Sequence, residues 1–369
     1  MSGVVIAGDG NGRIWRRNGP NNWAVAYDIN AGFLHRITAL SAWFPANDKF
    51  VGIDSASGSV STLTSVDDGA TLAVGGSPPS GSSTNHFGID DDGNFYAMDS
   101  KSTDGGGTWT AILPATAYGT QAANGYLWYW DKTSFYLHRA NLDGSGDTEL
   151  TSLGTITPSG TAFAKKAVIS TFPCSNRLFV FSERFDGTTL WSVDVTDPLV
   201  PTIGSSSLYN GDTIIFATPI TNQVGVAHSV GSTAGSAQQT TDGGGSWSLR
   251  ASDARIGGAF LSGAGTFSPV GVNTMAVDPG NLNNVYLVGA ALTTVFNYTM
   301  YAAYSTDQGS SWTIETVTTD YLQGATWPSY NDGRWFSIAV SGTPPCLRRG
   351  FPGVGRWSDG TTRDWFTRA

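Results

Sequence analysis

Short runs of alternating apolar and polar residues recur along the chain, separated by turns rich in Gly, Asp, Asn and Ser. A period of two is typical of a β-strand with one buried face. Arg177–Phe181 and Thr189–Val195 flank the turn residues Phe185-Asp186-Gly187, and Tyr126–Trp130 precedes Phe135–Arg139 in the same way. Such pairs predict β-hairpins. No segment shows the period of an amphipathic helix, so the pattern predicts an all-β protein.

Three further segments extend this pattern to other parts of the chain. The predicted strands are Val4–Ala7, His86–Ile89 with Phe95–Met98, and Val285–Gly289 with Tyr301–Ser305. Tyr126–Trp130 carries large side chains on both faces, which is typical of a strand sandwiched between two sheets. Regular short strands of this kind predict a sandwich, a barrel or a propeller.

The composition agrees with an all-β chain that makes many tight turns. Of its 369 residues, 47 are Gly and 13 are Trp, and only 13% carry charge. Few charges and many aromatic residues exclude an intrinsically disordered chain. The acidic residues are almost all Asp, which stabilises turns through side-chain hydrogen bonds, whereas Glu favours helices. We therefore interpret the acidity as turn chemistry.

An eight-residue pattern occurs three times and supplies an internal repeat. It pairs a hydroxyl residue, an Asp, a Gly, a second hydroxyl residue and a Trp at fixed spacing. A fourth copy keeps all but the Trp. The residues are Ser102, Asp104, Gly106, Thr108 and Trp109; Thr240, Asp242, Gly244, Ser246 and Trp247; Ser305, Asp307, Gly309, Ser311 and Trp312; and Ser65, Asp67, Gly69 and Thr71.

The residue types in this pattern suit a tight turn that leads into a strand. An Asp carboxylate accepts backbone N–H groups, a Gly adopts a left-handed conformation, and a Trp packs against its neighbours. The pattern resembles the Asp-box, or bacterial neuraminidase repeat. Membership of that family implies a β-propeller in which this turn joins the third and fourth strands of a blade. A second phrase, Met275 to Tyr286, resembles the opening of blades in xyloglucanase-like and photosystem-assembly-factor-like propellers.

The spacing of the turns predicts the number of blades. Degenerate copies around Asp143 and Asp186, and a last one at Ser358-Asp359, fill the gaps between the clear copies. Seven steps then divide the chain into repeats of about 53 residues, which suits four-stranded blades, although six or eight blades stay open. We predict one propeller domain over residues 1–369, with its ring closed by the N-terminal strand Val4–Ala7. The Gly/Pro/Ser-rich stretch Gly75–Thr84 is expected to be a loop between strands.

Charge and cysteine content limit the partners. The net charge of −9 disfavours nucleic acid and anionic membranes, and no run reaches the roughly 18 apolar residues of a membrane span. The N-terminus has no secretory signal pattern. The basic pairs Arg16–Arg17, Lys165–Lys166 and Arg348–Arg349 are interpreted as solvated loop charges. Cys174 and Cys346 lack metal-ligand spacing and are expected to be free buried thiols, although a disulfide between them stays open.

Two kinds of glycoside hydrolase are consistent with the resemblance and are judged on their residues. A sialidase requires an arginine triad and a Tyr–Glu pair. Arg13 is the nearest candidate for the first arginine but lacks the flanking Phe and Pro, and only Glu149, Glu183 and Glu315 are available as glutamates. A xyloglucanase-like enzyme requires two carboxylates across a cleft. The cluster Asp90-Asp91-Asp92 is the most concentrated group, and its position before Gly-Asn is typical of a hairpin turn.

Other site chemistry finds less support. His35, His86, His138 and His228 have no ligand spacing, so we expect neither a metal nor another cofactor. Gly8 to Arg13 resembles a phosphate loop only superficially and is interpreted as a hairpin turn.

The aromatic residues Trp327, Tyr330 and Trp335 lie in a loop-like context and are the candidate ligand-facing patch. The sequence thus favours a non-catalytic binding or structural module that contacts a partner protein or a glycan. Its composition resembles that of phage tail and adhesion proteins, which implies a virion or extracellular location. The alternative is a glycoside hydrolase acting on an extracellular polysaccharide.

Overall fold

The computed structural model describes fifteen segments of the chain, and the statements below concern these residues. They are 4–9, 13–28, 37–42, 50–56, 59–67, 69–79, 88–157, 167–182, 187–231, 234–256, 274–294, 297–323, 337–340, 355–356 and 362–363.

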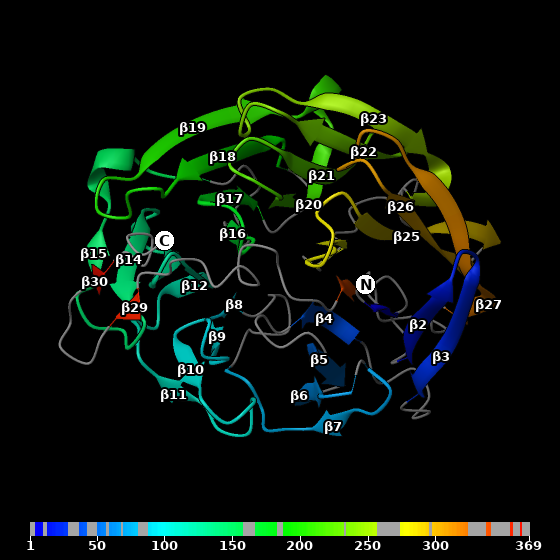
Figure 1. Ribbon diagram of the computed structural model, residues 1–369, viewed down its shortest axis with the longest axis horizontal. Helices are drawn as coiled ribbons and strands as arrows, with labels where there is room; N and C mark the ends of the chain where they lie inside the picture. The colour runs from blue at the N-terminus through cyan, green and yellow to red at the C-terminus, as the bar shows by residue number, and fades with distance from the viewer. Residues whose placement is uncertain are drawn as a thin grey trace, which may run out of the picture.

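Seven four-stranded antiparallel sheets form a ring of blades (Figure 1). In chain order, blade one holds β4 (Ile37–Ala42), β5 (Phe50–Ala56), β6 (Ser59–Ser65) and β7 (Ala73–Val74). Blade two holds β8 (Gly88–Ile89), β9 (Phe95–Ala97), β10 (Ser100–Ser102) and β11 (Thr110–Ala111). Blade three holds β12 (Ala117–Ala123), β13 (Tyr126–Asp131), β14 (Leu137–Asn141) and β15 (Thr148–Glu149).

The remaining blades follow the same order, with the first strand innermost and the last on the rim (Figure 1). Blade four holds β16 (Ala167–Ser170), β17 (Arg177–Ser182), β18 (Thr189–Asp194) and β19 (Thr202–Ser207). Blade five holds β20 (Thr213–Pro219), β21 (Gly225–Val230), β22 (Gly235–Thr240) and β23 (Ser248–Asp253). Blade six holds β24 (Met275–Val277), β25 (Val285–Thr294), β26 (Asn297–Ser305) and β27 (Thr313–Gln323).

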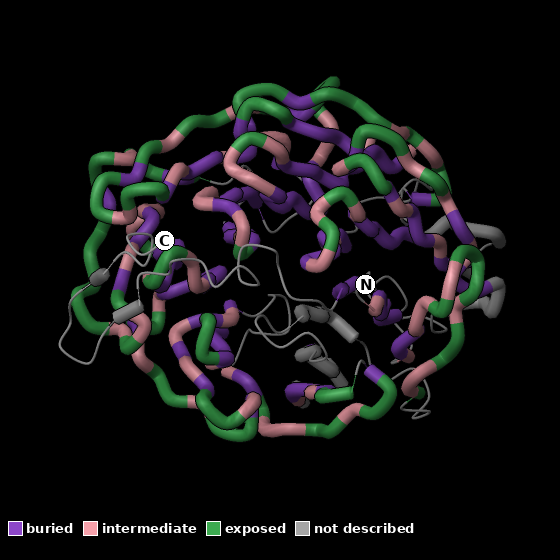
Figure 2. Tube along the Cα trace, in the orientation of Figure 1, coloured by how far each residue is buried: buried purple, intermediate pink, exposed green. Residues whose placement is uncertain are grey.

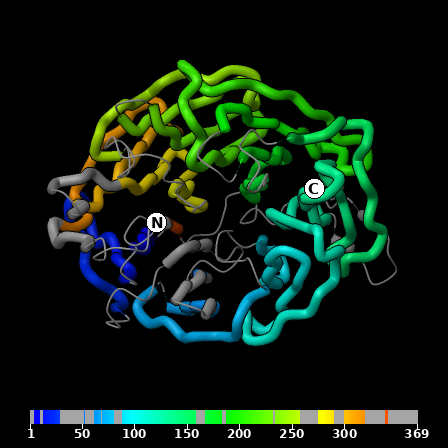
Figure 3. The backbone as a smooth tube through the Cα atoms, turned by 180° about the vertical axis from the view of Figure 1, so that it is seen from behind, coloured from blue at the N-terminus to red at the C-terminus, as the bar shows by residue number. Residues whose placement is uncertain are grey.

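Blade seven closes the ring by joining strands from the two ends of the sequence. Its strand order is β28 (Ser337–Val340), β1 (Val5–Gly8), β2 (Arg13–Gly19) and β3 (Asn22–Asp28). Figures 1 and 3 show β2 and β3 beside β27 of blade six. The prediction of a seven-bladed propeller is confirmed. The closure, however, uses three N-terminal strands where one was predicted.

Outside the blades, short elements complete the described structure. Single 3-10 turns occur at η2 (Thr151–Leu153), η3 (Tyr209–Gly211) and η4 (Ala254–Ile256), and a separate two-stranded ribbon pairs β29 (Gly355–Arg356) with β30 (Thr362–Arg363). No helix in the described part of the chain is long and apolar enough to cross a membrane.

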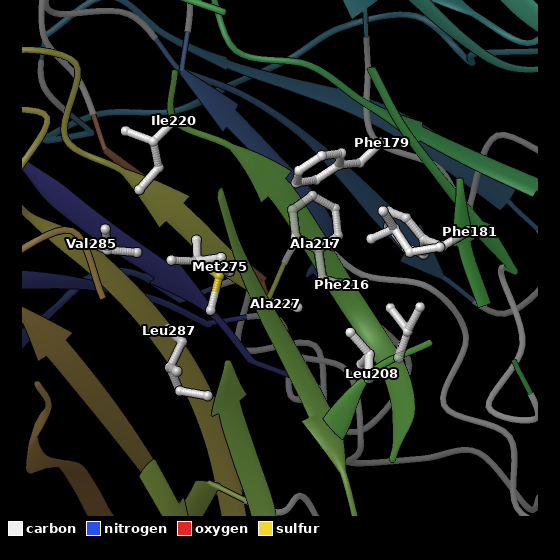
Figure 4. Close-up of a cluster of buried hydrophobic side chains, with 14 of the residues drawn as sticks. Phe179, Phe181, Leu208, Phe216, Ala217, Ile220, Ala227, Met275, Val285 and Leu287 are labelled. Carbon is white, nitrogen blue, oxygen red and sulfur yellow. The ribbon is translucent and has the colours of Figure 1, made fainter. Parts of the chain in front are cut away.

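The core lies between the faces of neighbouring blades, and Figure 2 shows buried residues along the blade strands. Figure 4 shows one such cluster, in which Phe179 and Phe181 of β17 face Phe216 of β20. The rings of Phe181 and Phe216 meet edge to face at 5.7 Å, a favourable aromatic geometry. Strand β13 buries both faces, since Trp128 and Trp130 pack in a different cluster from Leu127 and Tyr129. The expectation that this strand belongs to the core is confirmed.

Of the three predicted degenerate turns, the structure describes the one at Asp143. Asp143 does occupy the turn between β14 and β15, as predicted. In blade four this turn instead runs through Asp194 and Asp197, between β18 and β19. Asp186 and Ser358-Asp359 lie outside the described residues. The corresponding turn of blade seven is short and lies between β2 and β3. Blades four and seven are thus four-stranded although the turns between their third and fourth strands do not use the predicted residues.

Cys174 corrects another expectation. It is half-buried beside the cluster of blades four and five and is disulfide-bonded, so the interpretation as a free thiol was wrong. The sequence holds one other cysteine, Cys346, which lies outside the described residues.

Candidate functional site

The four copies of the repeated pattern, which we call the box turns, each join the third and fourth strands of a blade. They lie in blades one, two, five and six. In each, the first hydroxyl accepts the backbone N–H of the Gly four residues later, at 2.7–2.9 Å, and donates to the Asp carboxylate. The same carboxylate accepts the N–H of the second hydroxyl residue at 2.8–2.9 Å and its side-chain hydroxyl. One carboxylate thus organises each turn.

The Gly of each box turn is required by conformation and, in three turns, by contact. Gly106, Gly244 and Gly309 have φ between 89° and 97°, in the left-handed region. A Cβ on Gly106 would lie 2.4 Å from Thr62 of blade one, and a Cβ on Gly309 would lie 2.5 Å from Val226 of blade five. The box turn therefore presses its backbone against the preceding blade and spaces the two blades.

The box carboxylates are ionised at neutral pH. Hydrogen bonds from Thr108 lower the pKa of Asp104 to about 2, and those from Ser246 and Thr240 lower the pKa of Asp242 to about 2. A carboxyl of this kind is a poor general acid, because it holds no proton near pH 7.

A second group of Asp residues closes turns between other strands. Asp90, only 6% exposed, accepts two backbone N–H groups, the Asn94 amide and the hydroxyl of Tyr96 at 2.7 Å. Asp278 is fully buried and binds the N–H groups of Gly280 and Asn281. By strand order, these two turns and the box turns lie at one end of the ring, which we call the Asp-turn face.

Asp91 differs from the other acids of the Asp-turn face. It is exposed at the tip of the turn between β8 and β9. Its pKa is raised, first by partial loss of solvent and then by the neighbouring carboxylates of Asp90 and Asp92. The hairpin-turn interpretation of this cluster is confirmed, because Asp90 closes the turn between β8 and β9 and Asp91 lies exposed at its tip.

Arg13, the candidate sialidase arginine, is used within its own turn. Its backbone N–H and Nε donate to the fully buried carboxylate of Asp9, and the ion pair spans 2.9 Å. The indole of Trp15 donates to the same carboxylate. Gly8 ends β1 and Arg13 begins β2, and Asp9 links the two strands through Arg13, which agrees with the hairpin-turn interpretation of this segment.

Glu315 and Arg17 form a buried ion pair between blades six and seven, which corrects the interpretation of Arg17 as a solvated charge. The guanidinium donates to both carboxylate oxygens, at 2.6 and 3.1 Å. The indole N–H of Trp23 and the backbone N–H of Asn21 also donate to the Glu315 carboxylate. The guanidinium of Arg17 lies over the ring of Tyr304. Since Glu315 is on the outer strand β27, as predicted, it is unsuited to catalysis near the axis.

A titratable cluster in blade three was not predicted. Tyr129, His138 and Glu149 come from neighbouring strands at matching register. His138 Nδ1 lies 3.1 Å from the Tyr129 hydroxyl and 3.2 Å from Asp147 Oδ1, and its Nε2 lies 3.6 Å from Glu149. Burial raises the pKa of Tyr129. The hairpin of β13 and β14 sets Tyr129 opposite His138, so this pair could have been predicted from the sequence. The contact between Asp147 and His138 could not, because Asp147 lies in the turn after β14.

The remaining predicted site residues are untested. Trp327, Tyr330 and Trp335 lie outside the described residues, as do Glu183, His35, His86, Lys165–Lys166 and Arg348–Arg349. In the described segments, no group of three or more His, Cys, Asp and Glu side chains is arranged to hold a metal ion.

No protein-family model and no curated protein matches the sequence, whereas 351 chains of solved structures match the fold. A GH74 xyloglucanase from Xanthomonas campestris matches with a TM-score of 0.55 and 12% identity over 92% of this chain; the chain spans about half, 52%, of that enzyme. A protein described as a 6-phosphogluconolactonase, from Bacteroides fragilis, matches with a TM-score of 0.53, 10% identity and coverage of 92% and 98%. A protein from Lactobacillus plantarum matches with a TM-score of 0.53, 14% identity and coverage of 93% and 100%.

At these identities the likeness shows the fold alone. The predicted likeness in fold to xyloglucanases is confirmed. Membership of the Asp-box family stays a prediction. The geometry and the comparisons together show a β-propeller.

Proposed function

We propose that this propeller is a non-catalytic binding or structural module that contacts a partner protein or a glycan. The observation that carries the proposal is the use of its carboxylates. The Asp residues of the four box turns, with Asp90 and Asp278, are held by backbone N–H groups or hydroxyls of their own turns. A hydrolase needs carboxylates that are free to donate a proton or to activate water.

The two described glutamates support the same conclusion. Glu315 is locked to Arg17 at the rim, and Glu149 lies on the outer strand β15 next to His138. Neither is placed near the innermost strands, where the loops of a propeller converge on its axis.

We further propose that the module is a phage tail or adhesion component, located in a virion or outside the cell. The composition supports this, because the chain has only three Glu among 29 acidic residues and is rich in Gly. Mass spectrometry of purified virions from the source of the sequence tests the placement. Recovery of the chain only from cell cytoplasm would contradict it.

The aromatic residues Trp327, Tyr330 and Trp335 are the proposed ligand surface, because the sequence around them is loop-like and aromatic rings suit stacking on sugars or packing against a partner. Replacing all three by Ala is expected to weaken binding at least tenfold while leaving the thermal unfolding midpoint within a few degrees. Replacement of the buried Trp128 serves as the contrast, since it should instead lower the midpoint.

One observation favours glycoside hydrolysis as a second candidate. Asp91 is exposed, has a raised pKa and lies beside Asp92. One structural relative is named a xyloglucanase. Inverting hydrolases pair a protonated carboxyl with a carboxylate about 6.5–9.5 Å away.

A glycan array combined with a reducing-sugar assay separates the two candidates. The array should include xyloglucan and sialylated oligosaccharides, and the assay should compare the unmodified chain with Asp91→Asn and Asp143→Asn. We expect no release of reducing ends from any glycan. Turnover that is lost in Asp91→Asn and kept in Asp143→Asn would overturn the non-catalytic proposal.

A further inference from the structure

The rim of the propeller consists of seven outer strands, each with one unpaired edge (Figure 1). Exposed edges template pairing with another chain, so proteins keep them short, interrupt them with bulges or place charges on them. Strands β7, β11 and β15 have only two residues each. Strands β3, β23 and β27 pair with a register shift, and β3 and β23 also carry charged residues, Asp28 and Arg250.

Strand β19 has none of these protections. Its six residues, Thr202–Ser207, pair with β18 in one unbroken register and include no charged residue and no Pro. Its other edge has no strand partner in the sheet. The strand is also firmly held, because Ile203 packs on the core of blades three and four and Ser206 accepts the indole N–H of Trp247 at 3.1 Å. Among the described outer strands, β19 is therefore the edge best suited to strand addition.

Exposed apolar side chains lie at both ends of this edge. Leu199 and Val200 precede β19 and are 64% and 68% exposed, and Tyr209 follows it and is 44% exposed. They are three of the seven large apolar side chains that are exposed in the described segments. The turn before β19 is ordered by Asp197, which accepts the N–H of Leu199 at 2.9 Å. The apolar groups are thus presented by fixed backbone.

The spacing of these residues is self-complementary. Leu199 and Tyr209 lie equally far before and after Gly204. When two antiparallel strands pair about a two-fold axis, the residues equally far from the axis face each other. A two-fold axis at Gly204 pairs Thr202–Ser206 of the two copies and brings the turn with Leu199 and Val200 of one copy beside Tyr209 of the other, beyond each end of the new ladder.

The local charge distribution is compatible with the same partner. Each copy has a net charge of −9, yet no residue between Asp197 and Asp212 is charged. Pairing about Gly204 therefore brings no like charges face to face along the ladder. We infer that β19, with Leu199, Val200 and Tyr209, is an interface at which two copies of this chain join their fourth blades into one continuous eight-stranded sheet.

The test is the mass of the protein in solution, by sedimentation equilibrium at 1–500 µM, which brackets the range typical of weak interfaces. We expect twice the 38.8 kDa of one chain at the upper concentrations, with tighter association at higher salt because the net charges are screened. Gly204→Lys should dissociate the dimer, because it places two ammonium groups opposite each other; the dissociation constant should rise at least about tenfold.

Gly204 tolerates a side chain, since a Cβ there meets nothing within 4 Å. Gly19→Lys is the matched control, because Gly19 is equally open and lies on blade seven, and it should dimerise like the unmodified chain. Mixing Gly204→Lys with Gly204→Glu should restore a dimer. The pair Leu199→Ser and Tyr209→Ser should weaken the dimer in an independent way.

Three results would overturn the inference. One is a monomer at every concentration, including a monomer whose β19 edge binds a strand of another protein. The second is a Gly204→Lys variant that stays dimeric. The third is a mixture of Lys and Glu variants that stays monomeric.

Discussion

The hydroxyl of Thr240 shows how one residue type can define a turn. It is fully buried, accepts the N–H of Gly244 at 2.9 Å and donates to Asp242 at 2.7 Å. The sequence pattern predicts what the Asp and the Gly do in the turn, but it does not predict what the first hydroxyl does. That role depends on a contact across four residues, which a list of residue types does not reveal.

Thr240→Val keeps the shape of this side chain and removes its hydrogen bonds. The N–H of Gly244 then stays buried without a partner, which costs about 1–3 kcal/mol of the free energy of unfolding. Urea unfolding measures this loss. Thr240→Ser is the control, because it keeps the hydroxyl and loses only one buried methyl group, which costs about 0.8 kcal/mol. Equal losses for Val and Ser would contradict the role given to the hydroxyl.

His228 gives the stability a pH dependence. It is 1% exposed and lies between Thr274 and the carbonyl of Ile256, and burial lowers its pKa from 6.5 to about 4. Between these values the unfolded chain binds a proton that the folded chain does not. Stability is therefore complete above pH 6.5 and falls by about 1.4 kcal/mol per pH unit on acidification toward pH 4.

Urea unfolding between pH 4.5 and 7.5 tests this dependence. His228→Gln keeps polar atoms at the position but cannot titrate. The variant should be less stable and should show a slope shallower by about one proton in this window. The other groups of the chain titrate in both proteins and cancel in the difference. An unchanged slope would show that His228 has the same pKa in the folded and the unfolded chain.

At the scale of elements, local hairpins could be predicted and distant pairings could not. The paired runs around Asp91–Asn94 became β8 and β9, because turn residues and alternation are written into adjacent positions. The pair of Arg17 and Glu315 joins residues 298 positions apart. No local pattern reports such a contact, so Arg17 was predicted as a surface charge. The proposed aromatic site stays a prediction, because Trp327, Tyr330 and Trp335 lie outside the described residues.

Removing one partner of the Arg17–Glu315 pair should strongly lower the free energy of unfolding. Arg17→Leu leaves a carboxylate whose side chain is 1% exposed without its cation, which costs about 3–5 kcal/mol. Adding Glu315→Leu should recover much of this loss, because no charge then remains buried. A double-mutant cycle in urea measures the coupling.

The exposed pair of Arg255 and Asp253 is the matched control for that cycle. Their side chains are 48% and 27% exposed, so Arg255→Leu should cost less than about 1 kcal/mol. If Arg17→Leu costs no more than this control, the joint between blades six and seven is held by apolar packing alone.

At the scale of the whole molecule, one short ladder joins β28, the last strand of the ring in chain order, to the first strand, β1. Strand β28 pairs with β1 from Val5 opposite Val340 to Gly8 opposite Ser337. Ile338 is fully buried in this seam, in a cluster with Val5 and Trp15. The other blades are continuous in sequence, so their strands stay near their partners even when a ladder opens.

Ile338→Ala should therefore loosen the seam before the rest of the ring. We expect a loss of about 2–5 kcal/mol and faster amide exchange in β1, β2 and β28, with smaller changes in blades four and five. Hydrogen exchange read by mass spectrometry resolves these regions. Val226→Ala, in the buried core of blade five, is the control. Uniform acceleration in all blades would show that the ring opens only as a whole.

The seam between β1 and β28 also sets the order in which the protein can be completed during synthesis. The first three strands leave the ribosome about 330 residues before the strand that covers them. At about 5–20 residues per second, they wait roughly 15 s to a minute with an open apolar edge. Val5, Ala7 and Trp15 then lack the packing partners that blade six and β28 supply, such as Ile338 and Val340, until residue 340 is made. Nascent chains should thus be captured by a chaperone through their first 28 residues, and released when the ring closes.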